Sequence, residues 1–264
     1  MNRIEERLAR LKKEGKKAFI IYQTAGLSDM EKTKELIRVH EAEGTDILEL
    51  GIPFSDPTAD GPVIQDASYR SICQGTSLKK VFDAVEEVRR DCSLPIIFMM
   101  YYNTILHYGI SEFAAKCARV GVDGLIIPDL PKEEQFELSE ALEETGDATI
   151  LIQLVSPVSG DRIPMILDGA RGFVYCVSAM GVTGQAGTFH QNIRSYLENV
   201  KSLSPIPVMM GFGIRTAEDV EALKDTIDGC IVGTHFINLM EKHHYDVEAA
   251  GDYIRTFRRD LNRI

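Results

Sequence analysis

The sequence of 264 residues contains no tryptophan, and its five cysteines include no C-x-x-C pair. An odd number of cysteines without regular spacing predicts reduced, buried thiols and a cytoplasmic protein rather than a disulfide-rich secreted one. The six histidines lack H-E-x-x-H or other ligand spacing, so we predict no metal site. No apolar run is long enough to span a bilayer, and residues 1–20 are too charged for a signal peptide. These absences argue against secreted, metal-dependent and membrane-spanning proteins.

The chain also has a deficit of positive charge. Its 29 Lys and Arg stand against 40 Asp and Glu, a formal net charge of -11. Nucleic acids and anionic membrane surfaces are polyanions, so we expect neither as a partner. A small anionic substrate stays possible, because backbone N–H groups bind phosphate without net positive charge.

What the sequence does contain is a regular alternation of short apolar runs and amphipathic stretches. The amphipathic stretches show helical spacing and begin at Ser or Thr caps. Runs that are apolar on both faces are typical of parallel strands covered by helices. The eight runs cover residues 17–23, 46–52, 95–102, 123–130, 148–155, 172–178, 207–213 and 228–234.

Eight such units in this length predict an α/β protein, a closed (β/α)8 or TIM barrel, as a single domain over residues 1–264. Charged helices at 2–13 and 246–260 would be additions at the two ends of the chain. An open doubly wound sheet is the alternative, although it usually has fewer units. The sequence shows no linker and no obvious internal repeat.

One carboxylate interrupts the apolar second run, in LELGIPFSDPTADGP (48–62). Side chains alternate along a strand, so Ile47, Glu49 and Gly51 share one face. If that face lines the barrel, burial would raise the pKa of Glu49 and suit it to both acid and base roles. The alternative is a core glutamate paired with Lys or Arg, but the neighbouring runs contain neither inside them.

The loop after this run carries Asp56 and Asp60 between prolines. An Asp near Gly and Pro is often a turn or helix-cap residue, and Asp56 fits that interpretation. Asp60 is the stronger candidate for a catalytic role, because two carboxylates in different environments, here Glu49 and Asp60, can divide acid and base roles. We expect Asp60 to be the more solvated of the two and to stay ionised.

Glycine-rich segments follow the last three runs: SAMGVTGQAGTF (178–189), GFGIRT (211–216) and VGTHF (232–236). Barrels often bind phosphate with the loops after strands 7 and 8. Gly213, Gly233 and Thr234 are placed for that role, with Gly184 from the preceding loop. Tight turns are the alternative for each glycine. Residues 179–189 carry no charge and suit a lid.

These motifs together resemble the tryptophan synthase alpha chain family, over essentially the whole chain. ELGIPFSDPTADGPVIQ is the most specific of them, and GVTG, GFGI and VGT follow in the family's order. The resemblance implies a lyase of tryptophan biosynthesis that cleaves indole-3-glycerol phosphate to indole and glyceraldehyde 3-phosphate. It implies a retro-aldol reaction without a cofactor in this chain.

The resemblance also implies roles for single residues. Glu49 and Asp60 would be the catalytic pair, with Tyr175 beside Glu49 and Thr183 contacting Asp60. Gly184, Gly213, Gly233 and Thr234 would hold the phosphate. The apolar part of the substrate would pack against side chains that are otherwise plain barrel core: Tyr22, Met99, Phe212 and either Ile231 or Val232.

Three positions depart from the family's usual pattern. Many members have Phe where Tyr22 stands, and the added hydroxyl needs a polar partner. Members often have a basic residue soon after GVTG, where this chain has residues 185–187, Gln-Ala-Gly. His235 stands where small residues are common, and it is either a cationic donor or a surface residue at a helix start.

By resemblance, the chain's partner is a pyridoxal-phosphate beta chain in an α2β2 complex that receives the indole. Asp56, Pro57, Asn103 and Pro131 would form the interface. Two other functions stay open: another phosphate-binding barrel, such as an isomerase or synthase for a related precursor, and a non-catalytic regulator of a partner. A synthase would need a catalytic Lys at a strand end, and the retained Glu49 and Asp60 argue against the regulator.

Overall fold

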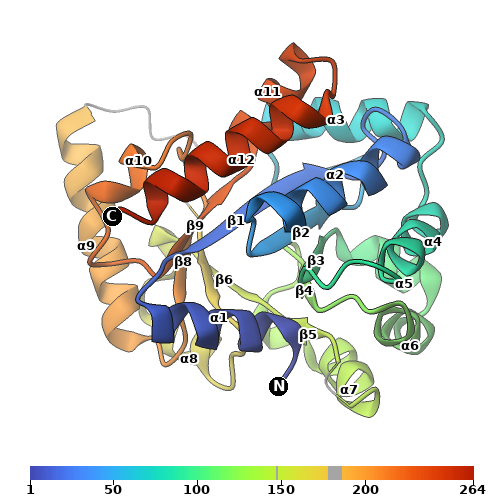
Figure 1. Cartoon of the computed structure of the whole chain (residues 1–264). Coiled ribbons are helices and arrows are strands. Elements are labelled where there is room, and N and C mark those ends of the chain that lie inside the picture. The colour runs from blue at the N-terminus through green and yellow to red at the C-terminus, as the bar shows by residue number, and fades with distance from the viewer. Residues whose placement is uncertain (147, 178–185) are drawn as a thin grey trace.

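The computed structural model describes residues 1–146, 148–177 and 186–264, and for residues 186–192 only the backbone. Figure 1 shows strands gathered at the centre of the molecule with helices around them. All strand pairs are parallel, and the sheet runs in the order β5-β4-β3-β2-β1-β9-β8-β7-β6. The structure is therefore the predicted (β/α)8 barrel, nearly closed, and not an open doubly wound sheet.

Each of the eight predicted apolar runs forms strand structure. The strands are β1 (Ala18–Thr24), β2 (Ile47–Gly51), β3 (Ile96–Met99), β4 (Gly124–Ile126), β5 (Ile150–Leu151), β6 (Gln153–Val155), β7 (Val174–Cys176), β8 (Val208–Met210) and β9 (Gly229–Val232). The fifth run is divided at Ile152. Its first part pairs with β4 and its second part with β7, so this one segment joins the two ends of the sheet.

Helices follow the strands and cover the outside of the barrel. They are α1 (Arg3–Glu14), α2 (Met30–Glu43), α3 (Pro62–Cys73), α4 (Leu78–Val88), α5 (Tyr102–Tyr108), α6 (Ile110–Val120), α7 (Phe136–Glu144), α8 (Ile163–Leu167), α9 (Ala186–Leu203), α10 (Glu218–Glu221), α11 (Thr234–Lys242) and α12 (Val247–Leu261). Short 3-10 turns lie at Lys132–Glu134 and Pro157–Arg162. Helices α1 and α12 confirm the predicted terminal additions. Helix α9 begins at Ala186, inside the segment 179–189 that was expected to be a loop.

Apolar side chains pack in two layers, one inside the barrel and one between the strands and the helices. In β2, Ile47 belongs to the interior cluster, whereas Leu48 and Leu50 pack outward against the helices. Helix α1 adds Ile4 and Leu8 to the interior cluster, so it covers the end of the barrel where the strands begin. The strand alternation then places Glu49 on the interior face, toward the end where the strands finish.

Candidate active site

Glu49 lies inside the barrel in the middle of β2. Its side chain is fully buried, and neither carboxyl oxygen has a hydrogen-bond partner among the described residues. Burial raises the pKa of Glu49 to about 8. The alternative of a core glutamate neutralised by Lys or Arg is wrong within the described part of the chain. At neutral pH the group is mostly protonated and can donate a proton.

Asp60 lies in the loop between β2 and α3, and it is 8% exposed. The Tyr101 hydroxyl donates a hydrogen bond to its Oδ2 at 2.9 Å and accepts one from the Ala59 N–H at 2.9 Å. Burial raises the pKa of Asp60, and the hydrogen bond from Tyr101 lowers it. Asp60 is more exposed than Glu49, in the predicted order, although it is buried rather than open to solvent. The hydrogen bond from Tyr101 supports its charged form.

Two tyrosines bring the two carboxyls into one environment. Burial and the nearby charges of Asp60 and Glu49 raise the pKa of Tyr22. Burial, Glu49 and Asp60 likewise raise the pKa of Tyr175. Each phenol therefore lies within the electrostatic reach of both acids. The Thr24 hydroxyl donates to the Tyr22 hydroxyl at 3.3 Å, which provides the polar partner that this tyrosine requires.

Two glycines make room for these tyrosines. A Cβ on Gly51 would lie 2.1 Å from the Tyr22 hydroxyl oxygen. A Cβ on Gly211 would lie 2.0 Å from a ring carbon of Tyr175. Both distances are shorter than any ordinary contact, so each tyrosine packs directly against bare backbone. The glycine after Leu50 thus serves the packing of the site rather than only the end of β2.

A cavity of about 560 Å³ opens at this end of the barrel. Seven of the residues predicted to contact substrate line it: Tyr22, Met99, Tyr175, Phe212, Gly213, Gly233 and Thr234. The lining also contains residues that were not predicted: Ile64, Gly211, Ile214, Arg215 and Asn238.

Met99 is only partly buried at the cavity wall. Ile231 also lines it and belongs to the interior cluster, whereas Val232 packs in the outer layer, against the helices. The placement of the Val232 side chain against the substrate is therefore wrong, because alternation along β9 turns it away from the cavity. Thr183 and Gly184 lie outside the described residues.

The far end of the cavity has the features of a phosphate site. Gly213 has a φ of 71°, a left-handed conformation that favours glycine. The carbonyl of Gly233 accepts from the N–H groups of Phe236 and Ile237, so the N–H groups of Thr234 and His235 precede the first hydrogen bonds of α11. No side chain caps this helix at Gly233. Free N–H groups at a helix N-terminus bind anions, and here they lie on the cavity wall.

The positions predicted for a partner interface share one rim of the barrel. Asp56 and Pro57 follow β2, Asn103 follows β3 in α5, and Pro131 follows β4. Asp56, Asn103 and Pro131 are exposed, and Pro57 is partly buried. All four lie on the segments that follow strand ends, the same end of the barrel as the cavity. Their role at an interface stays a prediction.

Tyr101 is the residue of the candidate site that the sequence pattern indicated least. It was placed within an apolar run as part of the barrel, yet its hydroxyl contacts the Asp60 carboxylate. Its ring stacks on Phe54, with centroids 5.0 Å apart and an interplanar angle of 19°. The available signal was a tyrosine directly after a strand, at the end of the barrel where active sites lie.

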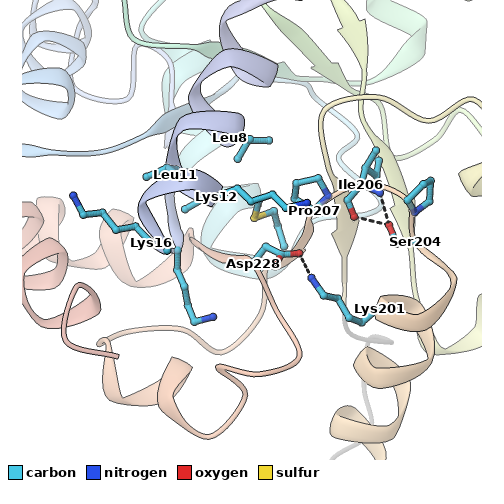
Figure 2. A pocket seen from close by; sticks show the side chains of 14 residues that line it. Leu8, Leu11, Lys12, Lys16, Lys201, Ser204, Ile206, Pro207 and Asp228 are labelled. Carbon is cyan, nitrogen blue, oxygen red and sulfur yellow. Dashed lines mark hydrogen bonds and ion pairs between the residues drawn. The ribbon is translucent and has the colours of Figure 1, made fainter.

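A second cavity of about 300 Å³ lies at the other end of the barrel, beside α1 and the segment before β8. In Figure 2, Lys12 extends from α1 toward Pro207, and Asp228 faces Lys201. That lining acid is already occupied: it pairs with Lys201 at 2.5 Å and accepts from the Val208 N–H at 2.7 Å. Glu49 has no such partners, and it lies beside Tyr22 and Tyr175, which line the cavity at the strands' C-terminal end. That cavity is therefore the candidate active site.

The described residues contain no group of three or more His, Cys, Asp and Glu side chains arranged to hold a metal ion. None of the described helices is long and apolar enough to cross a membrane.

Known proteins are similar to this chain in sequence and in fold. A family model described as "Tryptophan synthase alpha chain" matches residues 8–263. The tryptophan synthase alpha chain of Lachnospira eligens is 60% identical over 263 residues, which cover 99% of this chain and 100% of that protein. The corresponding protein of a Thermoanaerobacter species is 40% identical, with 100% of both chains covered.

Solved structures agree with the sequence relatives. The tryptophan synthase subunit alpha of Legionella pneumophila superposes with a TM-score of 0.91 at 34% identity, covering 100% of both chains. A chain of Mycobacterium tuberculosis tryptophan synthase gives a TM-score of 0.88 at 29% identity, over 99% of this chain and 98% of that one. The chain therefore belongs to the tryptophan synthase alpha chain family, the lyases that cleave indole-3-glycerol phosphate in tryptophan biosynthesis.

Proposed function

We propose that this chain performs the cleavage with Glu49 and Asp60 as its acid–base pair and with no cofactor of its own. The observation that carries this proposal is the buried, unpartnered carboxyl of Glu49 beside a cavity whose far end offers backbone donors for phosphate. A buried acid without a partner is costly to stability, so a catalytic role gives it a reason to be there.

The first step is protonation of indole C3. Glu49, mostly protonated at neutral pH because burial raises its pKa to about 8, donates this proton and leaves a positively charged indolenine. Asp60 stabilises that positive charge, because its carboxylate accepts a hydrogen bond from the indole N–H. Tyr101 is the positioning residue for Asp60, because it holds Oδ2 at 2.9 Å and leaves Oδ1 for the substrate.

The second step breaks the bond between C3 and the glycerol chain. Glu49 is now a carboxylate, and it accepts the proton of the side-chain hydroxyl as that carbon becomes the aldehyde of glyceraldehyde 3-phosphate. The electron pair of the broken bond returns to the ring and restores neutral indole. Because the protonated ring itself accepts these electrons, the reaction needs neither a redox cofactor nor an external electron sink.

The sides of the cavity suit the two parts of the substrate. Tyr22, Met99, Phe212 and Ile231 offer apolar surface for the indole. Gly213, Gly233 and Thr234 offer backbone N–H groups for the phosphate at the other part of the same cavity. The synthase alternative is not favoured, because the described strands contain no lysine that could act at a strand end.

The decisive experiment is to incubate the purified chain with indole-3-glycerol phosphate and to measure indole and glyceraldehyde 3-phosphate. Equal amounts of both products, without added cofactor and in the presence of a chelator, would support the proposal. Asp60→Asn should be nearly inactive while it still binds inorganic phosphate. Substantial turnover by Asp60→Asn would make Asp60 a turn residue and remove it from the mechanism.

We further propose that the chain works in the cytoplasm with a pyridoxal-phosphate beta chain, as an α2β2 complex that receives the indole. Indole is small and apolar, so direct transfer would prevent its loss. The rim that holds Asp56, Pro57, Asn103 and Pro131 lies at the same end of the barrel as the cavity and includes the loop of Asp60. A partner that docks there can therefore order the catalytic loop and raise turnover.

Pro57→Gly tests this coupling. The Pro57 carbonyl accepts from the Asp60 N–H at 3.1 Å, so a more flexible residue at position 57 should loosen the Asp60 loop. We expect the variant to lose more of the activation by a cognate beta chain than of its basal cleavage. Equal losses of both rates, or no rate change when the beta chain is added to wild type, would reject this loop as the coupling element.

A further inference from the structure

Two basic side chains lie at the phosphate end of the cavity. Arg215 belongs to the loop after β8, two residues past Gly213, and His235 is the second residue of α11. Both line the same cavity as Gly213, Gly233 and Thr234. Neither is needed for the backbone phosphate site described above, and both sit in an acidic chain with a formal net charge of -11.

The backbone of Arg215 makes two hydrogen bonds, whereas its side chain makes none with the described residues. Its N–H donates to Asp219 Oδ2 at 2.8 Å, and its carbonyl accepts from the Tyr253 hydroxyl at 2.8 Å. Its exposed guanidinium makes no hydrogen bond or ion pair with any residue that the structure describes. The arginine is therefore anchored at the cavity with all its side-chain donors available for a ligand.

Tyr253 of α12 also supports His235. The two rings lie with centroids 5.4 Å apart at an angle of 46°, and His235 is partly buried. Tyr253 therefore contacts both residues, through its hydroxyl at the Arg215 backbone carbonyl and through its ring at the His235 imidazole. The imidazole and the guanidinium are close enough that Arg215 affects the protonation of His235.

We propose that Arg215 and His235 bind the phosphate of the substrate through their side chains, as a cationic pair added to the backbone donors of Gly213, Gly233 and Thr234. This inference rests on the proposed function and names the ligand class as a dianionic phosphate monoester. A guanidinium offers two parallel hydrogen bonds to phosphate oxygens, which backbone N–H groups alone cannot match in charge. The pair also offsets the repulsion that an acidic chain exerts on a dianion.

The charges around His235 give this pair a dependence on pH. Burial lowers the pKa of His235, Arg215 lowers it further, and Asp219 opposes them; the other group that faces it is the Tyr253 ring. In the empty site the neutral imidazole is therefore favoured. A bound dianion supplies the negative charge that favours the imidazolium, so ligand binding should take up a proton and weaken as pH rises.

The test uses the full chain and two ligands, inorganic phosphate and indole-3-glycerol phosphate. Arg215→Gln should weaken phosphate binding and raise KM by about 5- to 20-fold, with kcat changed by less than about 2-fold, because the contact is equal in ground state and transition state. His235→Asn should abolish the proton uptake, which calorimetry in two buffers of different ionisation enthalpy measures. Unfolding curves establish that each variant is folded.

Arg194→Gln is the matched control. It removes a charge from the neighbouring helix α9, but the Arg194 guanidinium already pairs with Glu198 and with the Ala222 carbonyl. We expect its KM to stay within about 2-fold of wild type, as for an exposed ion pair.

Each outcome decides the inference. Variants of Arg215 and His235 that bind phosphate and retain KM and proton uptake as in wild type overturn it, while indole release by wild type leaves the proposed function intact. Conversely, phosphate binding that depends on Arg215 in a chain that releases no indole supports the cationic pair and overturns the proposed function.

Discussion

The two ends of the barrel treat buried carboxylates in opposite ways. At the end where the strands begin, Asp123 is 1% exposed and accepts from Arg89, Arg3 and the Ile96 N–H, each at 2.8 Å. At the end where the strands finish, Glu49 is fully buried and has no partner among the described residues. The first acid is satisfied by its partners and stabilises the fold, whereas the second has unsatisfied oxygens at the end of the barrel where we propose the chemistry to occur.

The paired end follows a repeated design. Asp46, Asp123 and Asp228 each precede a strand, and each carboxylate accepts from an N–H near the start of the neighbouring strand. The distances from the backbone nitrogen to the carboxylate oxygen are 2.8 Å for Phe19 and Asp46, 2.8 Å for Ile96 and Asp123, and 2.7 Å for Val208 and Asp228.

A basic residue neutralises each of these acids: Arg258 pairs with Asp46, Arg89 with Asp123 and Lys201 with Asp228. The sequence has no obvious internal repeat, because what recurs is a single aspartate at equivalent strand starts. Paired acids therefore stabilise one end of the barrel, whereas the acid inside the other end is unpaired among the described residues.

Removing a paired acid where the strands begin should have the largest effect, a loss of folding stability. Asp123→Asn leaves the buried guanidinium of Arg89 without its counter-charge, so we expect a loss of about 3–5 kcal/mol in the free energy of unfolding. Urea denaturation measures it. Asp91→Asn is the control, because Asp91 pairs with Arg38 on the surface and should cost at most about 1 kcal/mol. Similar losses in both variants would contradict the special role of the paired end.

Replacing Glu49, the unpaired acid at the other end, should lower turnover rather than stability. Glu49→Gln keeps the shape of the side chain and removes its proton exchange, so we expect indole release to fall by about 10²-fold or more. Phosphate binding should persist, and the free energy of unfolding should not fall, since no ion pair is lost. Near-normal indole release by this variant would remove Glu49 from the mechanism.

The unpaired state of Glu49 should also make the free energy of unfolding depend on pH. The pKa of Glu49 is raised from 4.5 to about 8 on folding, so its destabilisation is absent below about pH 4.5 and grows until about pH 8. We expect Glu49→Gln to gain stability relative to wild type across this window, by about 4–5 kcal/mol, because each unit of pKa shift corresponds to about 1.4 kcal/mol. Indole release by wild type should also decline above pH 8, as the acid form is lost. A difference in stability that stays constant from pH 5 to pH 8 would show that Glu49 is not perturbed.

Removing the support of Asp60 should have the smallest effect. Tyr101→Phe deletes the hydroxyl that contacts Asp60 and Ala59, and we expect kcat to fall by about 10-fold, the worth of one hydrogen bond to a charged group. Tyr102→Phe, the neighbouring tyrosine, is the control and should keep its rate. Rates that fall alike in both variants would point to packing rather than to the hydroxyl.

Much of the fold could be predicted because it depends on local pattern. Runs apolar on both faces indicate buried parallel strands, and all eight formed. The division of the fifth run at Ile152 could not be predicted, because it arises where the closing barrel must pair one segment with β4 on one side and β7 on the other. The orientation of β9, which places Ile231 inside and Val232 outside, likewise depends on register.

The sequence by itself determined which residues the site contains: an acid in an apolar strand, an acid on the following loop, and glycines after the last strands. Only the tertiary structure decided their state. Burial and the absence of a described partner raise the pKa of Glu49, while Tyr101, distant in sequence, closes over Asp60. The placement of Arg215 beside His235 was decided in the same way, by loops that meet only when the barrel closes. Protonation and contact depend on what surrounds a group in space, and that information is absent from local spacing.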